Sequence, residues 1–161
     1  MTEGRILVAE NKGIYLLKLS GDIRVTLCAS ISDYIEKIFS GDRVREVYVD
    51  LLEAEGIDST TLGLLAKLAL HTQERFLIRT RILCTNTDIL RMLDAMDIAG
   101  LFDIVGISDG PHMSPREIVP ADLDEETLRK HVLEAHKLLI QLNPSLASEF
   151  YDLITSLESL E

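Results

Sequence analysis

The chain has 161 residues, of which 47% are hydrophobic, so it is long enough for one compact core with a small appendage and too short for two full domains. Its net charge is −11, with 27 acidic against 16 basic residues, and the resulting repulsion disfavours nucleic acids and anionic membranes as partners. The N-terminus has no signal-peptide pattern and no apolar run is long enough to span a bilayer, so we expect a cytoplasmic protein.

The residues from 1 to 106 predict a domain in which strands alternate with helices. Their apolar periodicity predicts a hairpin of strands 6–9 and 14–19, a turn at 20–22, a helix over 27–39, a strand over 44–51, a helix over 59–76, a strand over 80–84, a helix from 89 that stops at Gly100, and a strand over 102–105. This order is typical of an α/β fold with a mixed sheet and helices packed on it. Cys28 and Cys84 lack the spacing of a zinc site or a disulfide framework, and we expect both to be reduced core residues.

The remainder of the chain differs in composition. Glycine and proline mark residues 107–120 as a linker. Residues 121–161 carry nine acidic and three basic residues, a net charge of −6, and their periodicity predicts two amphipathic helices separated by Asn143-Pro144. Such a hairpin cannot bury both apolar stripes by itself, so it must dock on the first domain, on a second copy or on a partner.

A run of hydroxyl side chains lies where the strand over 44–51 gives way to the helix over 59–76. Residues 57–63 read Ile-Asp-Ser-Thr-Thr-Leu-Gly, and Asp58 or Ser59 would be the N-cap of the helix. Capping uses only one of these side chains, so the run offers more hydroxyl groups than the helix start requires.

Residues 58–63 resemble the signature Asp-Ser-Ser-Gly-Leu-Gly of STAS domains, the family that includes the bacterial anti-sigma factor antagonists. Residues 19–22 resemble a Leu-x-Gly-Glu segment of the family, and residues 49–51 resemble the end of the strand before its signature. The resemblance covers residues 5–106 and implies a STAS-like mixed sheet, with the helical hairpin as an extension.

In the family, the first serine after the aspartate is phosphorylated by a serine kinase and dephosphorylated by a phosphatase; here that residue is Ser59. The resemblance implies that the unmodified chain binds an anti-sigma factor and that the phosphorylated chain releases it, with no cofactor and no metal. Thr60 is the less favoured phosphorylation site. The partner-binding residues implied in this way are Asp22, Arg24, Asp58, Ser59, Thr60, Thr61 and Leu62. Two of them depart from the family pattern, because Thr61 replaces a glycine and Arg24 replaces an aspartate.

The acidic hairpin makes the chain similar to pseudomonad antagonists linked to flagellar motility, secretion and biofilm control, and it leaves room for a second signalling protein as partner. An alternative function is a scaffold module of a signalling complex, with the hairpin as its main docking surface. Residues 134–138 weakly resemble a histidine phosphotransfer helix, but we expect His136 to be a surface histidine. No spacing suggests a catalytic triad, so we expect the chain not to be an enzyme.

Overall fold

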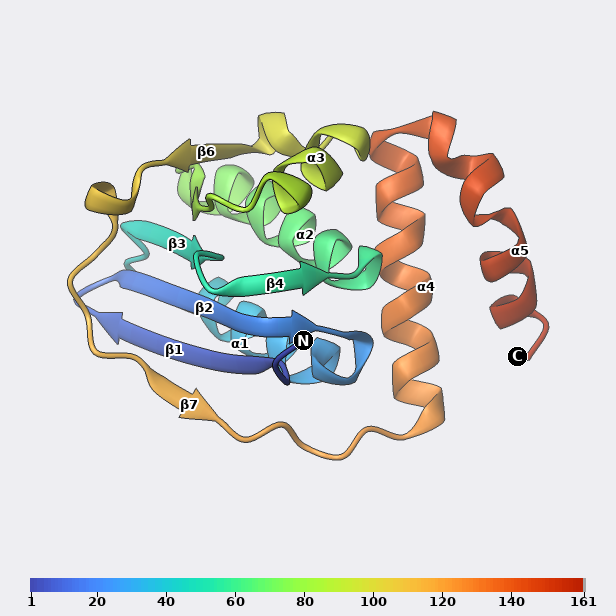
Figure 1. Ribbon diagram of the computed structural model, residues 1–161, viewed down its shortest axis with the longest axis horizontal. Coiled ribbons are helices and arrows are strands. Elements are labelled where there is room, and N and C mark those ends of the chain that lie inside the picture. The colour runs from blue at the N-terminus through green and yellow to red at the C-terminus, as the bar shows by residue number, and fades with distance from the viewer. Residues whose placement is uncertain (161) are drawn as a thin grey trace.

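The computed structural model describes residues 1–160 as a mixed sheet with helices on one face and a helical hairpin across one end (Figure 1). The strands are β1 (Arg5–Asn11), β2 (Ile14–Ile23), β3 (Glu46–Asp50), β4 (Ala54–Ile57), β5 (Thr80–Leu83), β6 (Phe102–Val105) and β7 (Arg116–Ile118). The α-helices are α1 (Cys28–Phe39), α2 (Ser59–Phe76), α3 (Thr87–Ala95), α4 (Glu125–Leu142) and α5 (Ala147–Glu158). Within the described residues, no helix combines the length and the apolar character that crossing a membrane requires.

The sheet confirms the predicted α/β class. Its strands follow the order β6-β5-β3-β2-β1-β7, and β4 pairs with the far end of β2. The pairs β2–β3, β3–β5 and β5–β6 are parallel, whereas β1 is antiparallel to both β2 and β7. The β1–β2 hairpin turns through Lys12 and Gly13 at φ values of 51° and 84°, and glycine adopts such left-handed conformations without strain.

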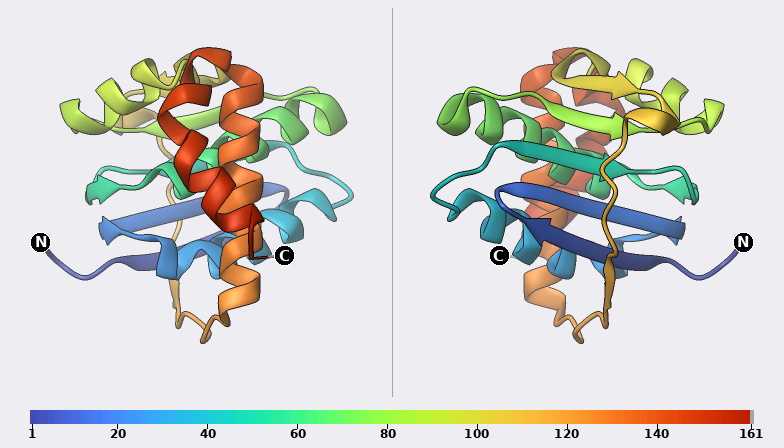
Figure 2. Two further views of the ribbon diagram at one scale, coloured as in Figure 1. Left: turned by 90° about the vertical axis from the view of Figure 1, so that its right-hand side faces the viewer. Right: turned by 90° about the vertical axis from the view of Figure 1, so that its left-hand side faces the viewer.

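The main core lies between the sheet and the helices α1, α2 and α3, which share one face (Figure 2). Cys28 and Cys84 are free and buried there, as expected, and burial raises the pKa of Cys28 to about 11. A smaller apolar cluster of Leu16, Tyr48 and Leu83 lies on the opposite face, where Met113 of the linker packs against it. The linker therefore shields apolar residues on the sheet face that lacks helices.

The edge of the sheet near the motif differs from the prediction in two ways. Residues 20–22 do not form a turn, because β2 continues to Ile23 through an irregularity between Gly21 and Asp22. Gly21 has φ of 80°, and a Cβ atom there would lie 2.4 Å from the carbonyl oxygen of Glu3. The strand β4, which the sequence did not predict, pairs with this bent end of β2. Three of its four residues, Ala54, Glu55 and Gly56, are of types that are depleted in strands, and Ile57 is its one β-branched residue.

Two further boundaries also differ from the prediction. The helix α3 ends at Ala95, short of Gly100, and Asp97 adopts a φ of 59° just beyond its end. The linker 107–120 contains a short 3₁₀ helix and the strand β7, in which Ile118 pairs with Ile6 of β1. The linker therefore adds a strand to the sheet before the chain reaches the hairpin.

The predicted hairpin of α4 and α5 is present, and it docks on the first domain. The helix α4 packs across α2, and α5 packs back on α4 at the end of the molecule (Figure 2). Leu139, Leu146 and Phe150 belong to the main core, and Leu139 is fully buried. Of the three docking modes that the sequence left open, the structure shows the intramolecular one.

Candidate functional site

The helix α2 begins with two polar side chains that have separate tasks. Asp58 is the N-cap, and its Oδ1 accepts a hydrogen bond of 2.9 Å from the backbone N–H of Thr61. Ser59 is the first helical residue, and it is partly exposed. Because Asp58 does the capping, the Ser59 hydroxyl is left for another contact.

That contact is a hydrogen bond to a histidine of the hairpin. The Oγ atom of Ser59 lies 2.7 Å from Nε2 of His136, which is 77 positions later in the chain. The Nδ1 atom of the same ring lies 2.6 Å from the backbone carbonyl of Val132. A carbonyl oxygen only accepts, so Nδ1 carries a hydrogen, and Nε2 of the neutral ring accepts the hydroxyl hydrogen of Ser59.

His136 is a buried residue, which contradicts the expectation of a surface histidine. Its side chain is 2% exposed, and the ring of Phe150 contacts it edge-on with 4.6 Å between ring centroids. The sequence does contain a signal for this burial. His136 follows Val132 by four positions and precedes Leu139 by three, so it lies on the apolar stripe of α4. A polar residue on such a stripe needs a buried partner.

Close contact between α2 and α4 is possible because small residues meet where they cross. A Cβ atom added to Gly63 would lie 2.7 Å from both Cβ and the carbonyl oxygen of Ala135. Real side chains do not approach this closely, so only a glycine fits at position 63 with α4 in place. Gly63 lies one helical turn after Ser59, and it therefore allows α4 to lie close to the hydroxyl.

An ion-pair cluster borders the same contact. Nζ of Lys67 lies 2.8 Å from Glu134 of α4 and 3.4 Å from Glu36 of α1. Desolvation by itself would lower the pKa of Lys67, but the hydrogen bonds and charges of Glu134 and Glu36 together raise it. The lysine thus links α4 to the two helices on which it rests.

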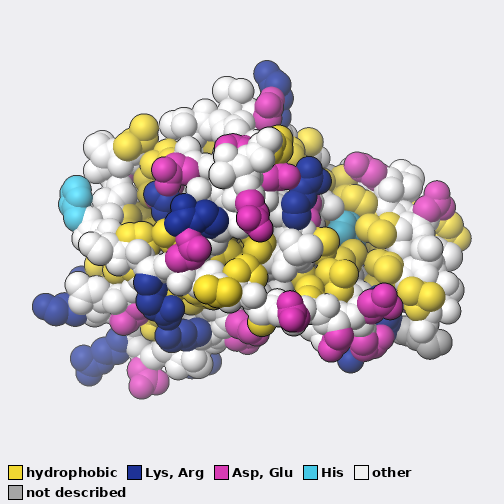
Figure 3. Space-filling model, turned by 60° about the horizontal axis from the view of Figure 1, so that its bottom comes forward, with side chains coloured by type: hydrophobic (Ala, Val, Ile, Leu, Met, Phe, Trp, Pro, Cys, Tyr) yellow, Lys and Arg dark blue, Asp and Glu magenta, His cyan; other side chains and the backbone are white. Residues whose placement is uncertain are grey.

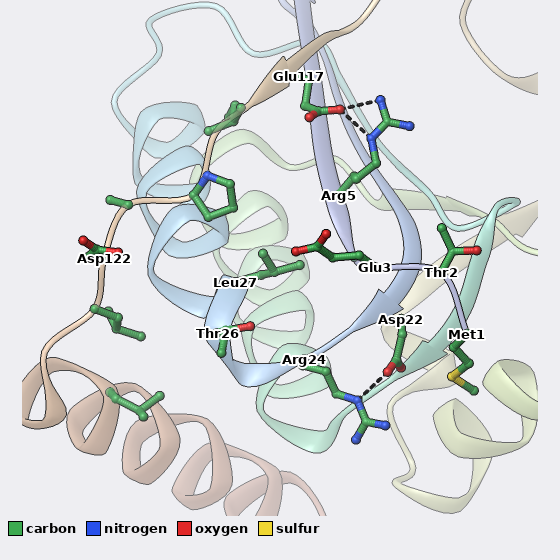
Figure 4. A pocket seen from close by; sticks show the side chains of 16 residues that line it. Met1, Thr2, Glu3, Arg5, Asp22, Arg24, Thr26, Leu27, Glu117 and Asp122 are labelled. Carbon is green, nitrogen blue, oxygen red and sulfur yellow. Dashed lines mark hydrogen bonds and ion pairs between the residues drawn. The ribbon is translucent and has the colours of Figure 1, made fainter.

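The end of β2 contributes a second polar pair next to α2. Nε of Arg24 lies 2.7 Å from Oδ2 of Asp22, and Asp22 pairs with Gly56 just before the motif. The hydrogen bond and charge of Asp22 raise the pKa of the exposed Arg24, and the charge of Asp58 adds to this rise. Both side chains border a cavity of about 930 Å³ that extends to the linker before α4 (Figure 4).

The structure divides the residues that the sequence proposed for partner binding into two groups. Asp22, Arg24, Asp58 and Ser59 keep at least part of their surface exposed. Thr60, Thr61 and Leu62 are 4%, 0% and 0% exposed, so their side chains belong to the interior. Within the described residues, Oγ1 of Thr61 has no hydrogen-bond partner.

Comparisons with known proteins cover the sheet domain. Residues 5–115 match the model of the STAS domain family, and no curated protein matches the chain. The structure of the Bacillus cell fate determinant SpoIIAA in its phosphorylated form is similar, with a TM-score of 0.53 and 13% identity over 65% of this chain and 94% of that chain. The structure of the anti-sigma factor antagonist SpoIIAA in its unphosphorylated form has a TM-score of 0.49 and 16% identity over 56% of this chain and 81% of that chain. The first of these likenesses shows a shared fold.

Proposed function

Because the chain belongs to the STAS domain family, as residues 58–63 predicted, we propose that it is a phosphorylation-controlled partner-switching protein. It acts as an anti-sigma factor antagonist that binds an anti-sigma factor or a related signalling partner while Ser59 is unmodified, and it releases that partner when Ser59 is phosphorylated. The observation that carries this proposal is the position of Ser59, whose hydroxyl starts α2, is not used in capping and lies at the edge that holds Asp22 and Arg24.

The first turn of α2 tolerates a phosphate and stays helical. A phosphate carries close to two negative charges, and the amide groups at a helix N-terminus stabilise such charge by about 0.3–1 kcal/mol. A partner that desolvates the same position is affected much more, because about 2.7 kcal/mol is already a hundredfold in affinity. The switch therefore acts on the interface and leaves α2 intact.

This function requires a serine kinase and a phosphatase that act on Ser59, and a second signalling protein is a further candidate partner. The pathway that we propose is the cytoplasmic control of transcription that adjusts motility, secretion and biofilm formation. The chain itself performs no catalysis in this scheme.

The test compares the binding of Ser59→Ala and Ser59→Asp to candidate anti-sigma factors from the same organism, measured by calorimetry. We expect Ser59→Ala to bind at least as tightly as the unmodified chain and Ser59→Asp to bind about a hundredfold more weakly. Thr87→Asp is the control, because it places the same charge at the exposed start of α3. Equal affinities for the two Ser59 variants would contradict the proposal. Intact-mass measurement of protein from its native cells, with and without phosphatase treatment, reports the modification itself.

A scaffold function for the hairpin is the second candidate. The observation that favours it is the exposure of large apolar side chains on α5 and just beyond it, with Tyr151 at 65%, Leu153 at 37% and Leu160 at 71%. Figure 3 shows hydrophobic side chains gathered over this end of the molecule. Tyr151→Glu combined with Leu160→Glu would abolish partner binding in a scaffold, whereas Ser59→Asp would leave it nearly unchanged.

A further inference from the structure

The hydroxyl that the proposed kinase must reach is hydrogen-bonded to another part of the same chain. Ser59 donates to His136 of α4 over 2.7 Å, and His136 is buried against Phe150 of α5. Both helices of the hairpin therefore take part in covering one side chain of the STAS domain. A surface that was identified from the STAS domain alone is occupied by another part of the same chain.

This cover conflicts with phosphoryl transfer. In transfer from ATP, the bond between Ser59 Oγ and phosphorus forms as the bond between the γ-phosphorus and the ADP oxygen breaks, and the hydroxyl proton leaves to a base of the kinase. In the closed arrangement that proton is directed at Nε2 of His136, and α4 lies against α2 one turn further on, where Ala135 meets Gly63. The kinase and α4 cannot occupy the same side of Ser59 together.

We propose that the α4–α5 hairpin is an intramolecular cover of Ser59, which must leave α2 before a kinase or partner reaches the hydroxyl, and that a phosphate on Ser59 keeps it open. This inference rests on the proposed function of Ser59 and names the regulation of that site. The hairpin and the partner are then alternative occupants of one face of α2, around Ser59 and Gly63.

The chemistry of the contact explains why a phosphate keeps the hairpin open. The hydrogen on Nδ1 is donated to Val132, so Nε2 of the neutral ring offers only a lone pair to Ser59. A phosphate presents oxygen acceptors in place of the donated hydrogen, and it needs room where the two atoms are 2.7 Å apart. It also adds negative charge beside Asp58 and opposite a segment, residues 121–161, whose net charge is −6.

The fold allows the hairpin to leave without breaking the sheet. The last strand, β7, ends at Ile118, and the described strand pairs involve no residue after it. Residues 119–122, which lead to α4, are all exposed. Opening of the hairpin therefore exposes the contacts of α4 and α5 with the domain to solvent, and it leaves every described strand pair of the sheet in place.

Hydrogen exchange followed by mass spectrometry tests the cover on the full chain. We expect Ser59→Glu to accelerate the exchange of peptides from α4 and α5 about tenfold or more, while peptides from β2 and β3 keep their protection. Thr87→Glu is the matched control. Like Ser59, Thr87 is the first residue of a helix and follows its N-cap, here Asn86, but Thr87 is exposed. It should leave the hairpin unchanged. Unchanged or slower exchange of the hairpin in Ser59→Glu would overturn the inference.

A second variant opens the hairpin from its own side. Ala135→Leu places a larger side chain against Gly63 and changes no residue of the STAS domain. We expect the same rise in hairpin exchange, with little further rise when Ser59→Glu is added. Additive effects of the two substitutions would contradict a shared opening. None of these measurements uses a partner, so they test the cover separately from the proposed function. Hydrogen exchange can contradict the cover while the Ser59 variants still differ in partner binding. It can also support the cover while the Ser59 variants bind partners equally.

Discussion

The helices α2 and α3 start in nearly the same way and end up in different surroundings. Each has an Asx residue as its N-cap, because Asp58 accepts from the N–H of Thr61 and Asn86 accepts from the N–H of Asp88. Each then begins with a hydroxyl residue, Ser59 in one and Thr87 in the other. By local chemistry alone, both are helix starts where a phosphate would be tolerated.

The difference lies in what packs on the two helix starts. Thr87 is exposed, whereas the hydroxyl of Ser59 donates a hydrogen bond to His136 of α4. The fourth residue after each hydroxyl shows the same contrast, since Gly63 lies against Ala135 and the side chain of Arg91 is 79% exposed. A capped hydroxyl is thus a local feature that recurs in the chain, and tertiary packing engages only one of these two hydroxyl groups.

The largest expected difference in stability between variants of the two helices is at Gly63 and Arg91. Gly63→Ala would favour an isolated helix by about 1 kcal/mol, but its Cβ would overlap Ala135, so we expect a net loss of about 1–3 kcal/mol in the free energy of unfolding. Arg91→Ala should change stability by less than about 0.5 kcal/mol, because its ion pair with Asp88 is exposed. Urea denaturation measures both. A stabilised Gly63→Ala variant would show that α4 does not rest on α2 in solution.

Substitutions of the two N-cap residues should lower stability by similar amounts, in contrast to substitutions of Gly63 and Arg91. Asp58→Ala and Asn86→Ala each remove a side chain that accepts from the first turn of its helix, and each should cost about 1 kcal/mol of unfolding free energy. Thermal denaturation of the two variants provides the comparison. If Asp58→Ala were much the more costly, the α2 cap would have a task beyond capping, and the likeness of the two helix starts would not hold.

The elements of the fold that the sequence predicted are those with a strong periodic pattern. The bounds of α2 agree residue for residue with the expected helix 59–76, since it is long, amphipathic and capped. The strand β4 was missed because Ala54, Glu55 and Gly56 are residue types that are depleted in strands, and β7 was missed because its three residues carry too little pattern; each pairs with a strand that is distant in the sequence, β2 or β1. Pairing with a distant strand cannot be read from the short segment itself.

The same limit applies to the candidate site. Residues 58–63 identified the hydroxyl through a local motif, but the partner of that hydroxyl is His136, and no sequence spacing links positions so far apart. What the sequence did show was a hairpin that is unable to bury its own apolar stripes. That observation predicted that the hairpin docks on another surface without saying which one, and the burial of His136 was not predicted.

The smallest expected effect concerns the third residue of each helix, where α2 has Thr61 and α3 has Ile89. Both side chains are buried, but Oγ1 of Thr61 has no hydrogen-bond partner within the described residues. Thr61→Val keeps the shape and removes the unsatisfied hydroxyl, so we expect it to raise the free energy of unfolding by about 0.5–1 kcal/mol. Thr72→Val is the control in the same helix, because the Thr72 hydroxyl is hydrogen-bonded to Thr80 over 2.9 Å. That variant should lose about 1–3 kcal/mol by leaving a buried partner unpaired. Urea denaturation of both would decide the matter, since a loss of stability in Thr61→Val means that its hydroxyl does have a partner in solution.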